Sequence, residues 1–412
     1  MKPNVVLIVV DCFRAQSFLG EGSAKIPFLD SLRKKGTAFT QAISTSSTTS
    51  PCFASILTGK YSFKHGVRTI GGYALNPNVS TIAKAFKDAG YHTIAEVTGP
   101  LLEEVNMGSG FDDYNFRETN QTLYSDWGEN LAAKLAASKK PYFLFLHLWD
   151  LHRPRYMTKE FNKPKYGKIA YERSVSCMDS YLQKLLSSLD KDTVIVITGD
   201  HGEKIPSNKG EEYFNHLCIG FYAVLRRFGL SKKYCERESH GFDVSEDVIK
   251  IPLFFKGTVF PKGKVVGQQV GQVDIVPTIA DALGLKLDSD VDGKSLVPLT
   301  QGKNVEEKPV FIEACGIKIA SKESWLEGIR TSKWKYLHGA FNSEIPKQLY
   351  DLENDPEEKN NLAQKETSVV GKMRTKLESL KSAKQRKELV GKKLEGADKK
   401  KLEERLRKLG YL

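Results

Sequence analysis

Three short segments of the chain are almost continuously apolar, and each is followed at once by polar residues. They are Asn4–Val10 (NVVLIVV), Tyr142–Leu148 (YFLFLHL) and Thr193–Thr198 (TVIVIT). Apolar runs of this length predict strands that are buried on both faces, as in a parallel sheet. We therefore expect these strands to lie inside a layered α/β fold.

Helical segments alternate with the strands. Pro27–Lys35 (PFLDSLRKK) ends at Gly36, while Ser80–Ala89 (STIAKAFKDA) begins with a Ser cap, stops at Gly90 and leads into the strand-like YHTIAEV. This alternation predicts a doubly wound, mostly parallel central sheet with helices on both faces.

The last quarter of the chain has a different pattern. EGIRTSKWKYLH predicts a strand pair, and KQLYDLENDPEEKNNLA predicts a strand, a turn and a helix start. We therefore expect two units: a large α/β domain over residues 1–307 and a small α+β subdomain over residues 308–412 that closes with a charged amphipathic helix. The basic run KSAKQRKELVGKKLEGADKKKLEERLRKLG has Glu interleaved at helical spacing, which indicates a solvated helix.

Composition and charge exclude some classes of protein. With 40% hydrophobic and 27% charged residues, the chain can form a core and is not disordered. The net charge of +12 would suit nucleic acid, an anionic substrate or a basic tail, but no aromatic-rich basic strand or recognition helix appears, so a nucleic-acid partner is not expected. The six cysteines show no CxxC spacing, and no apolar run is long enough to span a membrane, which favours a cytoplasmic protein. The oligomeric state is left open.

Each buried strand is followed by polar residues at the same end. Asp11 follows the first strand, Asp150 and His152 follow the second, and Asp200 and His201 follow the third. In open α/β sheets the carboxyl ends of the strands face a common crevice where ligands bind. Carboxylates and neutral imidazoles held on strand ends are suitable ligands for a divalent metal. Asp11 alone could equally cap a helix, and the Asp-His-Gly-Glu run is what favours a metal site.

A hydroxyl-rich loop, from Thr48 to Pro51, leads into a short helix that Gly59 ends. A helix N-terminus offers free N–H groups and a positive dipole end, which suit a phosphate or sulfate oxyanion. A hydroxyl at that place can also bind metal and attack an ester. An ordinary capped helix would have the same sequence, because Ser and Thr are the commonest caps.

In this order the motifs resemble those of the alkaline phosphatase/sulfatase superfamily, and specifically its sulfatase-like branch. NVVLIVVDCFRA is similar to the family's first metal-binding strand, SPCFASILTGKYSFKHGV to its nucleophile helix, TGDHGE to its late metal-binding strand and QLYDLENDPEEKNNLA to its C-terminal signature. The resemblance implies an alkaline phosphatase-like fold and one or two divalent ions (Mn, Zn, Mg or Ca) bound by Asp11, Thr49, Asp200 and His201. It further implies that Thr49 is the nucleophile and forms a covalent phospho- or sulfo-threonine.

The departures from the family pattern bear on the substrate. Formylglycine sulfatases read C/S-x-P-x-R where this chain reads TSPCF, from Thr49 to Phe53. Threonine cannot become formylglycine and the arginine is missing, so we expect no formylglycine. The family's paired first aspartates are replaced by Asp11 and Cys12. The pattern is instead similar to the Thr-nucleophile phosphodiesterases, phosphonate hydrolases and phosphoglycerol transferases of the superfamily.

Further histidines leave the number of metal ions open. HLWDLHRP, which starts at His147, resembles a family loop, and His240 stands where sulfatases have Lys and two-metal phosphodiesterases have His. Asp150, His152 and His240 could therefore complete a second metal site. In a one-metal site His152 would instead be the leaving-group acid and His240 an anion contact. By the same resemblance, His65 would brace the nucleophile helix.

Together these features predict a metal-dependent hydrolase of small anionic esters, with a phosphodiester or phosphonate monoester preferred. Three alternatives stay open: a sulfatase without formylglycine, a transferase that passes a phospho group to a sugar or lipid hydroxyl, and an inactive homologue that binds anions. The insert over residues 202–239 links two site residues, so we expect it to form a lid and to set specificity.

Overall fold

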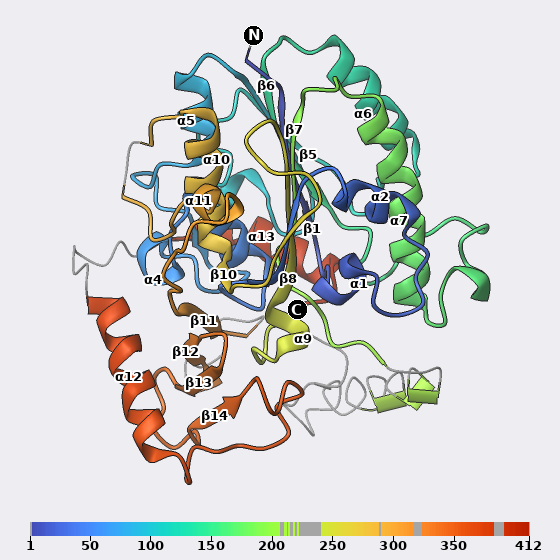
Figure 1. Ribbon diagram of the computed structural model, residues 1–412. Coiled ribbons are helices and arrows are strands. Elements are labelled where there is room, and N and C mark those ends of the chain that lie inside the picture. The colour runs from blue at the N-terminus through green and yellow to red at the C-terminus, as the bar shows by residue number, and fades with distance from the viewer. Residues whose placement is uncertain are drawn as a thin grey trace.

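The computed structural model describes residues 2–206, 240–287, 290–316, 324–382 and 391–411, together with the single positions 210, 211, 213, 214, 217, 218 and 221. Figure 1 shows a central sheet with helices on both sides and a smaller sheet at one end. This arrangement confirms the predicted α/β class and its added C-terminal subdomain.

The central sheet has nine strands in the order β10-β2-β8-β7-β1-β6-β4-β5, with β9 also paired to β2. Strand β8 is antiparallel to both of its neighbours, and every other pairing in the sheet is parallel. The sheet is therefore mostly parallel, as predicted. Its strands are β1 (Val5–Val10), β2 (Thr37–Ile43), β4 (His92–Val97), β5 (Asp113–Phe116), β6 (Tyr142–Leu148), β7 (Val194–Gly199), β8 (Lys250–Lys256), β9 (Lys264–Val266) and β10 (Val270–Gly271).

Strand β1 is central to the hydrophobic core. All six of its side chains are fully buried; the odd-numbered ones join one hydrophobic cluster and the even-numbered ones join another on the opposite face. A strand needs apolar residues at every position when both faces are covered, which explains the continuous VVLIVV run.

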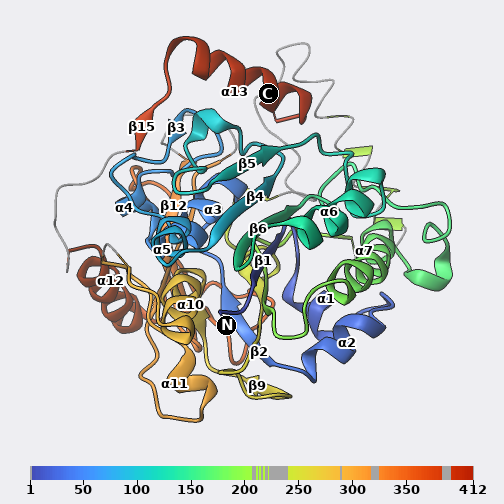
Figure 2. The same ribbon diagram turned by 90° about the horizontal axis from the view of Figure 1, so that it is seen from above.

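Helices cover both faces of the sheet (Figures 1 and 2). The odd-numbered face of β1 packs against α3 (Thr49–Thr58), α5 (Ile82–Asp88), α10 (Ile275–Leu283) and α13 (Gly396–Lys408). The even-numbered face packs against α1 (Ala15–Leu19), α2 (Pro27–Arg33), α6 (Asp126–Ala137) and α7 (Ala170–Ser187). Shorter elements are α4 (Ser62–His65), β3 (Tyr73–Ala74), η1 (Glu103–Val105), η2 (Pro164–Tyr166), α9 (Glu246–Ile249), η4 (Gln272–Asp274) and α11 (Val297–Thr300).

The C-terminal subdomain is a four-stranded antiparallel sheet in chain order. It comprises β11 (Val310–Ala314), β12 (Leu326–Arg330), β13 (Trp334–Gly339) and β14 (Gln348–Asp351), with α12 (Thr367–Ser382) packed against it. The predicted strand pair is thus β12 and β13. The division at residues 307 and 308 stays a prediction.

The basic C-terminal run is not one solvated helix, and that prediction is wrong. Helix α12 ends at Ser382, and the chain then forms β15 (Lys392–Lys393), which pairs with β3, before α13 begins. Helix α13 buries Leu402 and Leu406 in the core of the central sheet. Two leucines four residues apart form an apolar stripe on an otherwise charged helix, and that stripe is enough to dock it.

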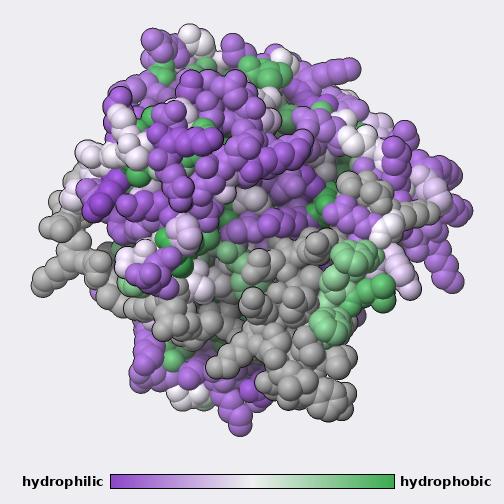
Figure 3. Space-filling model, turned by 90° about the horizontal axis from the view of Figure 1, so that it is seen from below, coloured by the Kyte–Doolittle hydropathy of each residue, from purple (hydrophilic) through white to green (hydrophobic). Residues whose placement is uncertain are grey.

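Where it is coloured, the face seen from below in Figure 3 is mostly hydrophilic, and it carries an apolar patch. Four of the exposed large hydrophobic residues belong to the insert over residues 202–239: Tyr213, Phe214, Leu217 and Phe221. Most of this insert lies outside the described residues, so its role as a lid stays a prediction. Across the part of the chain that the structure describes, none of the helices combines the length and apolarity that crossing a membrane requires. The cytoplasmic location also stays a prediction.

Candidate active site

The register of three parallel strands explains why distant acidic residues meet. Strand β1 lies between β6 and β7, with Val10 opposite both Leu148 and Gly199. The residues that follow these positions, including Asp11 and Asp200, therefore leave the sheet at the same level. The N–H of Asp11 also donates to the carbonyl of Leu148 at 2.8 Å.

Asp11 is the hub of the site. Its carboxylate accepts a hydrogen bond from the Thr49 hydroxyl at 3.3 Å, and His147 Nε2 lies 3.4 Å from the same oxygen. The next residue, Cys12, has a left-handed backbone with φ of 58° and donates its N–H to Asp200 Oδ1 at 3.2 Å. Non-glycine residues in this conformation are strained, and such strain clusters at functional sites.

Asp200 and His201 each leave one buried polar atom without a hydrogen bond. Asp200 Oδ1 accepts the His201 N–H at 2.7 Å, but its Oδ2 has no hydrogen-bond partner. His201 Nδ1 is 2.8 Å from the Gly202 carbonyl, so it carries the proton and leaves Nε2 as a lone-pair donor, also without a hydrogen-bond partner. These two atoms lie 3.4 Å apart at full burial.

The two carboxylates have opposite pKa shifts. Burial would raise the pKa of Asp11, but the hydrogen bond from His147 and the charges of His152 and His201 hold that pKa well below its usual range. Burial and the nearby charge of Asp11 raise the pKa of Asp200 well above its usual value. Two neighbouring carboxyl groups in a buried site cannot both ionise unless a cation compensates their negative charges.

The donor set fits a divalent metal. Ligand atoms of Asp11, Cys12 and His201 lie within 4.8 Å of one another. Asp200 adjoins them: its Oδ1 accepts the Cys12 N–H, and its unpaired Oδ2 lies 3.4 Å from His201 Nε2. Deprotonated oxygens and a neutral imidazole whose second nitrogen donates to a backbone carbonyl are the usual surroundings of such an ion. The predicted residues Asp11, Thr49, Asp200 and His201 are thus brought together, although their roles stay a prediction.

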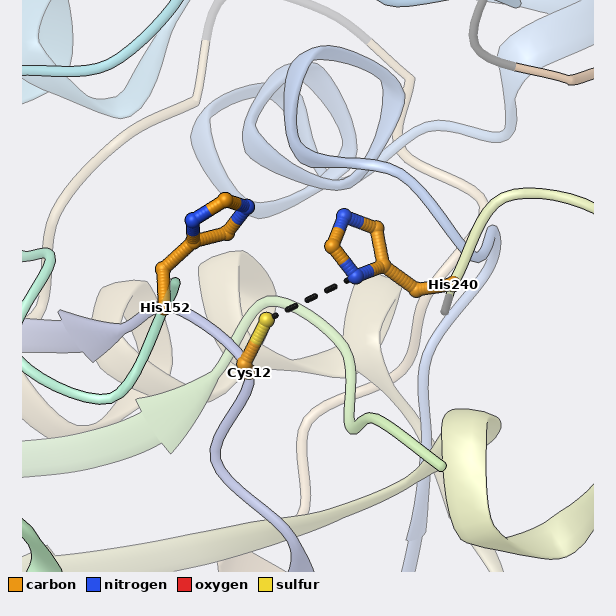
Figure 4. A group of neighbouring side chains, drawn as sticks. All are labelled: Cys12, His152 and His240. Carbon is orange, nitrogen blue, oxygen red and sulfur yellow. Dashed lines mark hydrogen bonds between the residues drawn. The ribbon is translucent and has the colours of Figure 1, made fainter. Parts of the chain in front are cut away.

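A second group of possible ligands is formed by Cys12, His152 and His240 (Figure 4). Cys12 Sγ lies 3.7 Å from His240 Nδ1, and the ring of His240 lies 4.4 Å from that of His201 between centroids. Asp150 is in neither group of possible ligands. Its carboxylate is buried with Arg117 as the nearby cation, and burial raises its pKa to about 6.

The hydroxyl-rich loop and the helix that follows it are buried, and His65 contacts that helix. Every residue of α3 is buried, and the helix ends at Gly59 with φ of 65°, as predicted. His65 Nδ1 accepts the N–H of Val67 and its Nε2 lies 3.1 Å from Ser55 Oγ, which confirms the bracing role. Among the described residues, the hydroxyls of Ser46, Ser47 and Thr48 are also buried without a partner: they are polar groups available to a ligand.

Two residues at the site were not predicted from the sequence. Glu203 faces His240 Nδ1 at 3.8 Å and is held by Arg155. Tyr411 places its hydroxyl 2.7 Å from His152 Nε2. Glu203 could have been found, because it belongs to the TGDHGE run, whereas no motif surrounds Tyr411.

Comparisons with known proteins identify the family of the chain. The Sulfatase family matches residues 3–285, and the C-terminal region of N-sulphoglucosamine sulphohydrolase matches residues 241–383. Arylsulfatase K of Bos taurus is 23% identical over 92% of this chain and 81% of its own length. Choline-sulfatase of Rhizobium meliloti (strain 1021) is 26% identical over 66% of this chain and 56% of its own length.

Solved structures share the fold. The phosphonate monoester hydrolase of Agrobacterium radiobacter superimposes with a TM-score of 0.73 at 20% identity, covering 93% of this chain and 96% of its own. A 2-O GAG sulfatase superimposes with a TM-score of 0.70 at 17% identity, covering 92% of each chain. At these identities the likeness concerns the fold alone.

Proposed function

The chain belongs to the sulfatase family of the alkaline phosphatase/sulfatase superfamily, and on that premise we propose that it is a metal-dependent hydrolase of small anionic esters with Thr49 as nucleophile. The preferred substrate class is a phosphodiester or a phosphonate monoester. The observation that carries the proposal is the position of Thr49. This residue begins helix α3, and its hydroxyl lies 3.3 Å from the Asp11 carboxylate.

The proposed site separates metal binding from substrate binding. Asp11, Asp200 and His201 would hold one divalent cation, with the Thr49 hydroxyl beside it. That cation would lower the pKa of the hydroxyl and neutralise charge on the ester. The N–H groups of Thr49 and Ser50, in the first turn of α3, have no partner within the helix, and we propose that they bind the ester's anionic oxygens.

The reaction would then run in two displacements on Thr49. After the Thr49 hydroxyl has lost its proton to water, its oxygen forms a bond to phosphorus as the bond to the leaving oxygen breaks. His152, protonated from solvent, is proposed to give a proton to that leaving oxygen. Water next attacks the phospho-threonine, so the Thr49 hydroxyl is restored and the acid product leaves. His240 is proposed as a contact to the anion. A sugar or lipid hydroxyl in place of water would make the same chain a transferase.

A sulfate ester is the second candidate substrate. It is supported by the family name and by the curated relatives, which are sulfatases. Thr49 argues against the formylglycine chemistry of that family, so a sulfatase of this type would use the threonine itself. Intact-protein mass spectrometry with peptide mapping checks residue 49 directly and would also detect a trapped phospho- or sulfo-threonine.

The test is a panel of a phosphodiester, a phosphonate monoester and an aryl sulfate, assayed after EDTA treatment with Mn, Zn, Mg or Ca restored in turn. Thr49→Ala should lower turnover of the preferred ester by about 10³-fold or more. Thr58→Ala is the matched control, because Thr58 is a buried threonine at the opposite end of the same helix and its hydroxyl donates to the Ala54 carbonyl. Turnover of sulfate alone, or equal activity of both variants and the wild type, would overturn the proposal.

A further inference from the structure

The segment over residues 391–411 returns to the central sheet and is firmly docked there. Strand β15 pairs with β3, and Leu394 donates its N–H to the Gly72 carbonyl at 3.0 Å. Leu402 and Leu406 of α13 are 1–2% exposed within the main hydrophobic cluster. Figure 2 shows α13 beside the edge of the sheet that ends in β5.

A buried arginine ties α13 to the loops at the carboxyl ends of the strands. Arg405 Nε donates to the Gly99 carbonyl, in the loop that follows β4, at 3.0 Å. Its guanidinium also lies 5.0 Å from the ring centre of Phe116 and pairs with Glu118. A buried charge that is hydrogen-bonded in this way fixes the position of the helix, because any other position would leave it unpaired.

The end of α13 directs Tyr411 into the active site. Gly410 adopts φ of 82°, and the N–H of Tyr411 donates to the Leu406 carbonyl at 2.9 Å. This hydrogen bond closes the helix end and turns the chain inward. The side chain of Tyr411 is consequently buried, with 6% of its surface exposed.

The Tyr411 hydroxyl joins the two histidines of the site. It lies 2.7 Å from His152 Nε2 and 3.4 Å from His240 Nε2. His152 Nδ1 is 2.6 Å from the Arg153 carbonyl and so carries the proton, which makes Nε2 the acceptor of the Tyr411 O–H. The phenol oxygen then accepts from His240 Nε2–H. His240 Nδ1 lies 3.7 Å from Cys12 Sγ and 3.8 Å from the Glu203 carboxylate.

We propose that Tyr411 is a positioning residue of the active site, whose hydroxyl fixes the ring orientation of His152 and His240 and holds a proton on His240 Nε2. An imidazole is free to turn about its side-chain bonds unless a partner holds it, and the docked helix supplies that partner at little entropic cost. Neither family match extends to residue 411. The inference deepens the proposed function and depends on it only for the activity readout.

The experiment compares Tyr411→Phe with Tyr114→Phe in the full chain. Tyr114 is a matched control because its hydroxyl donates to the Leu101 carbonyl at 2.9 Å, in contact with neither histidine. Tyr411→Phe should lower kcat by about 10- to 100-fold, whereas Tyr114→Phe should not. The ¹⁵N imidazole signals of His152 and His240 should change only in Tyr411→Phe, recorded with ¹⁵N-histidine in protein free of metal and substrate.

The imidazole spectra separate this inference from the proposed function. If none of the esters is turned over, a change in tautomer in Tyr411→Phe still supports the role of Tyr411. Unchanged spectra overturn it, and so does a rise in turnover, which would mean that the phenol blocks the site. Should Tyr411→Phe fail to fold, fluorotyrosine at position 411 keeps the hydroxyl and alters its acidity. The same signals must then shift.

Discussion

Replacing Asp200 by Asn should stabilise the metal-free protein and remove its response to metal. Asp200 Oδ1 accepts the N–H groups of Cys12 and His201, and an amide oxygen can accept both. The amide NH₂ would take the place of Oδ2, which has no hydrogen-bond partner and lies 3.4 Å from His201 Nε2. His201 Nε2 is an acceptor, so the new amide group can donate a hydrogen bond to it. The substitution thus pairs His201 Nε2 and removes the unpaired carboxylate oxygen Oδ2.

The expected gain in the free energy of unfolding follows from two unpaired atoms, Asp200 Oδ2 and His201 Nε2, and from the nearby charge of Asp11. Leaving a buried polar group without a partner costs about 1–3 kcal/mol, so the free energy of unfolding of the metal-free variant should exceed that of the wild type by about this amount at pH 7. Burial and the Asp11 charge raise the pKa of Asp200 in the folded protein. Its contribution to stability is therefore fully present below the unfolded pKa of about 4 and is lost as pH rises through the folded pKa. The gain in the variant should shrink as pH falls toward about 4.

Metal should reverse the order of stability. An ion at 100 times its dissociation constant adds about 2.7 kcal/mol to a protein that binds it only when folded. The wild type should gain this, and Asp200→Asn should gain much less. Urea denaturation at several pH values, in EDTA and in Mn or Zn, measures both effects. Asp88→Asn, at an exposed ion pair with Lys84, is the control and should stay within about 0.5 kcal/mol. The reasoning would be refuted if Asp200→Asn had a lower free energy of unfolding than the wild type in EDTA at pH 7. It would also be refuted if metal raised the free energy of unfolding equally in both proteins.

Two further substitutions test the framework around the site. Gly99→Ala should cost about 1–3 kcal/mol, because Gly99 has φ of 68° and an added Cβ would lie 2.2 Å from the Trp149 ring; urea titration followed by tryptophan fluorescence measures this, and an unchanged midpoint would contradict it. Burial would raise the pKa of Glu246, but Lys335 and Arg330 lower it to about 2. Its contribution is present above pH 4.5 and lost as pH falls through about 2, so Glu246→Gln should cost about 2–3 kcal/mol at pH 7. A cost that persists unchanged in denaturation at pH 3 would count against this assignment.

The sequence was sufficient for the parts of the site that sit at strand ends. A buried parallel strand can be recognised from a continuous run of apolar residues. The residue that follows the run then lies at the carboxyl edge of the sheet. Asp11, Asp200 and His201 could therefore be located before the structure was seen. The direction of β8 could not, because the apolar run around Pro252 has the same composition in a parallel or an antiparallel pairing.

Tyr411 shows where such reasoning stops. Its contacts, His152 and His240, are 259 and 171 residues away in the sequence. No local periodicity encodes a contact at that separation, and the charged residues around Leu402 and Leu406 conceal the apolar stripe that docks the helix. Asp150 is a different case: its place after a strand suggested a metal ligand, the structure puts Arg117 near its carboxylate, and its role as a ligand stays a prediction.

The position of β1 in the sheet has a consequence for synthesis of the protein. This strand leaves the ribosome well before its partners β6 and β7, which span residues 142–148 and 194–199. Until β6 has emerged, both edges of the apolar VVLIVV segment are unpaired, and one edge stays unpaired until β7 follows. Such segments aggregate, so we expect the yield of folded protein to rise with slower expression or added chaperone.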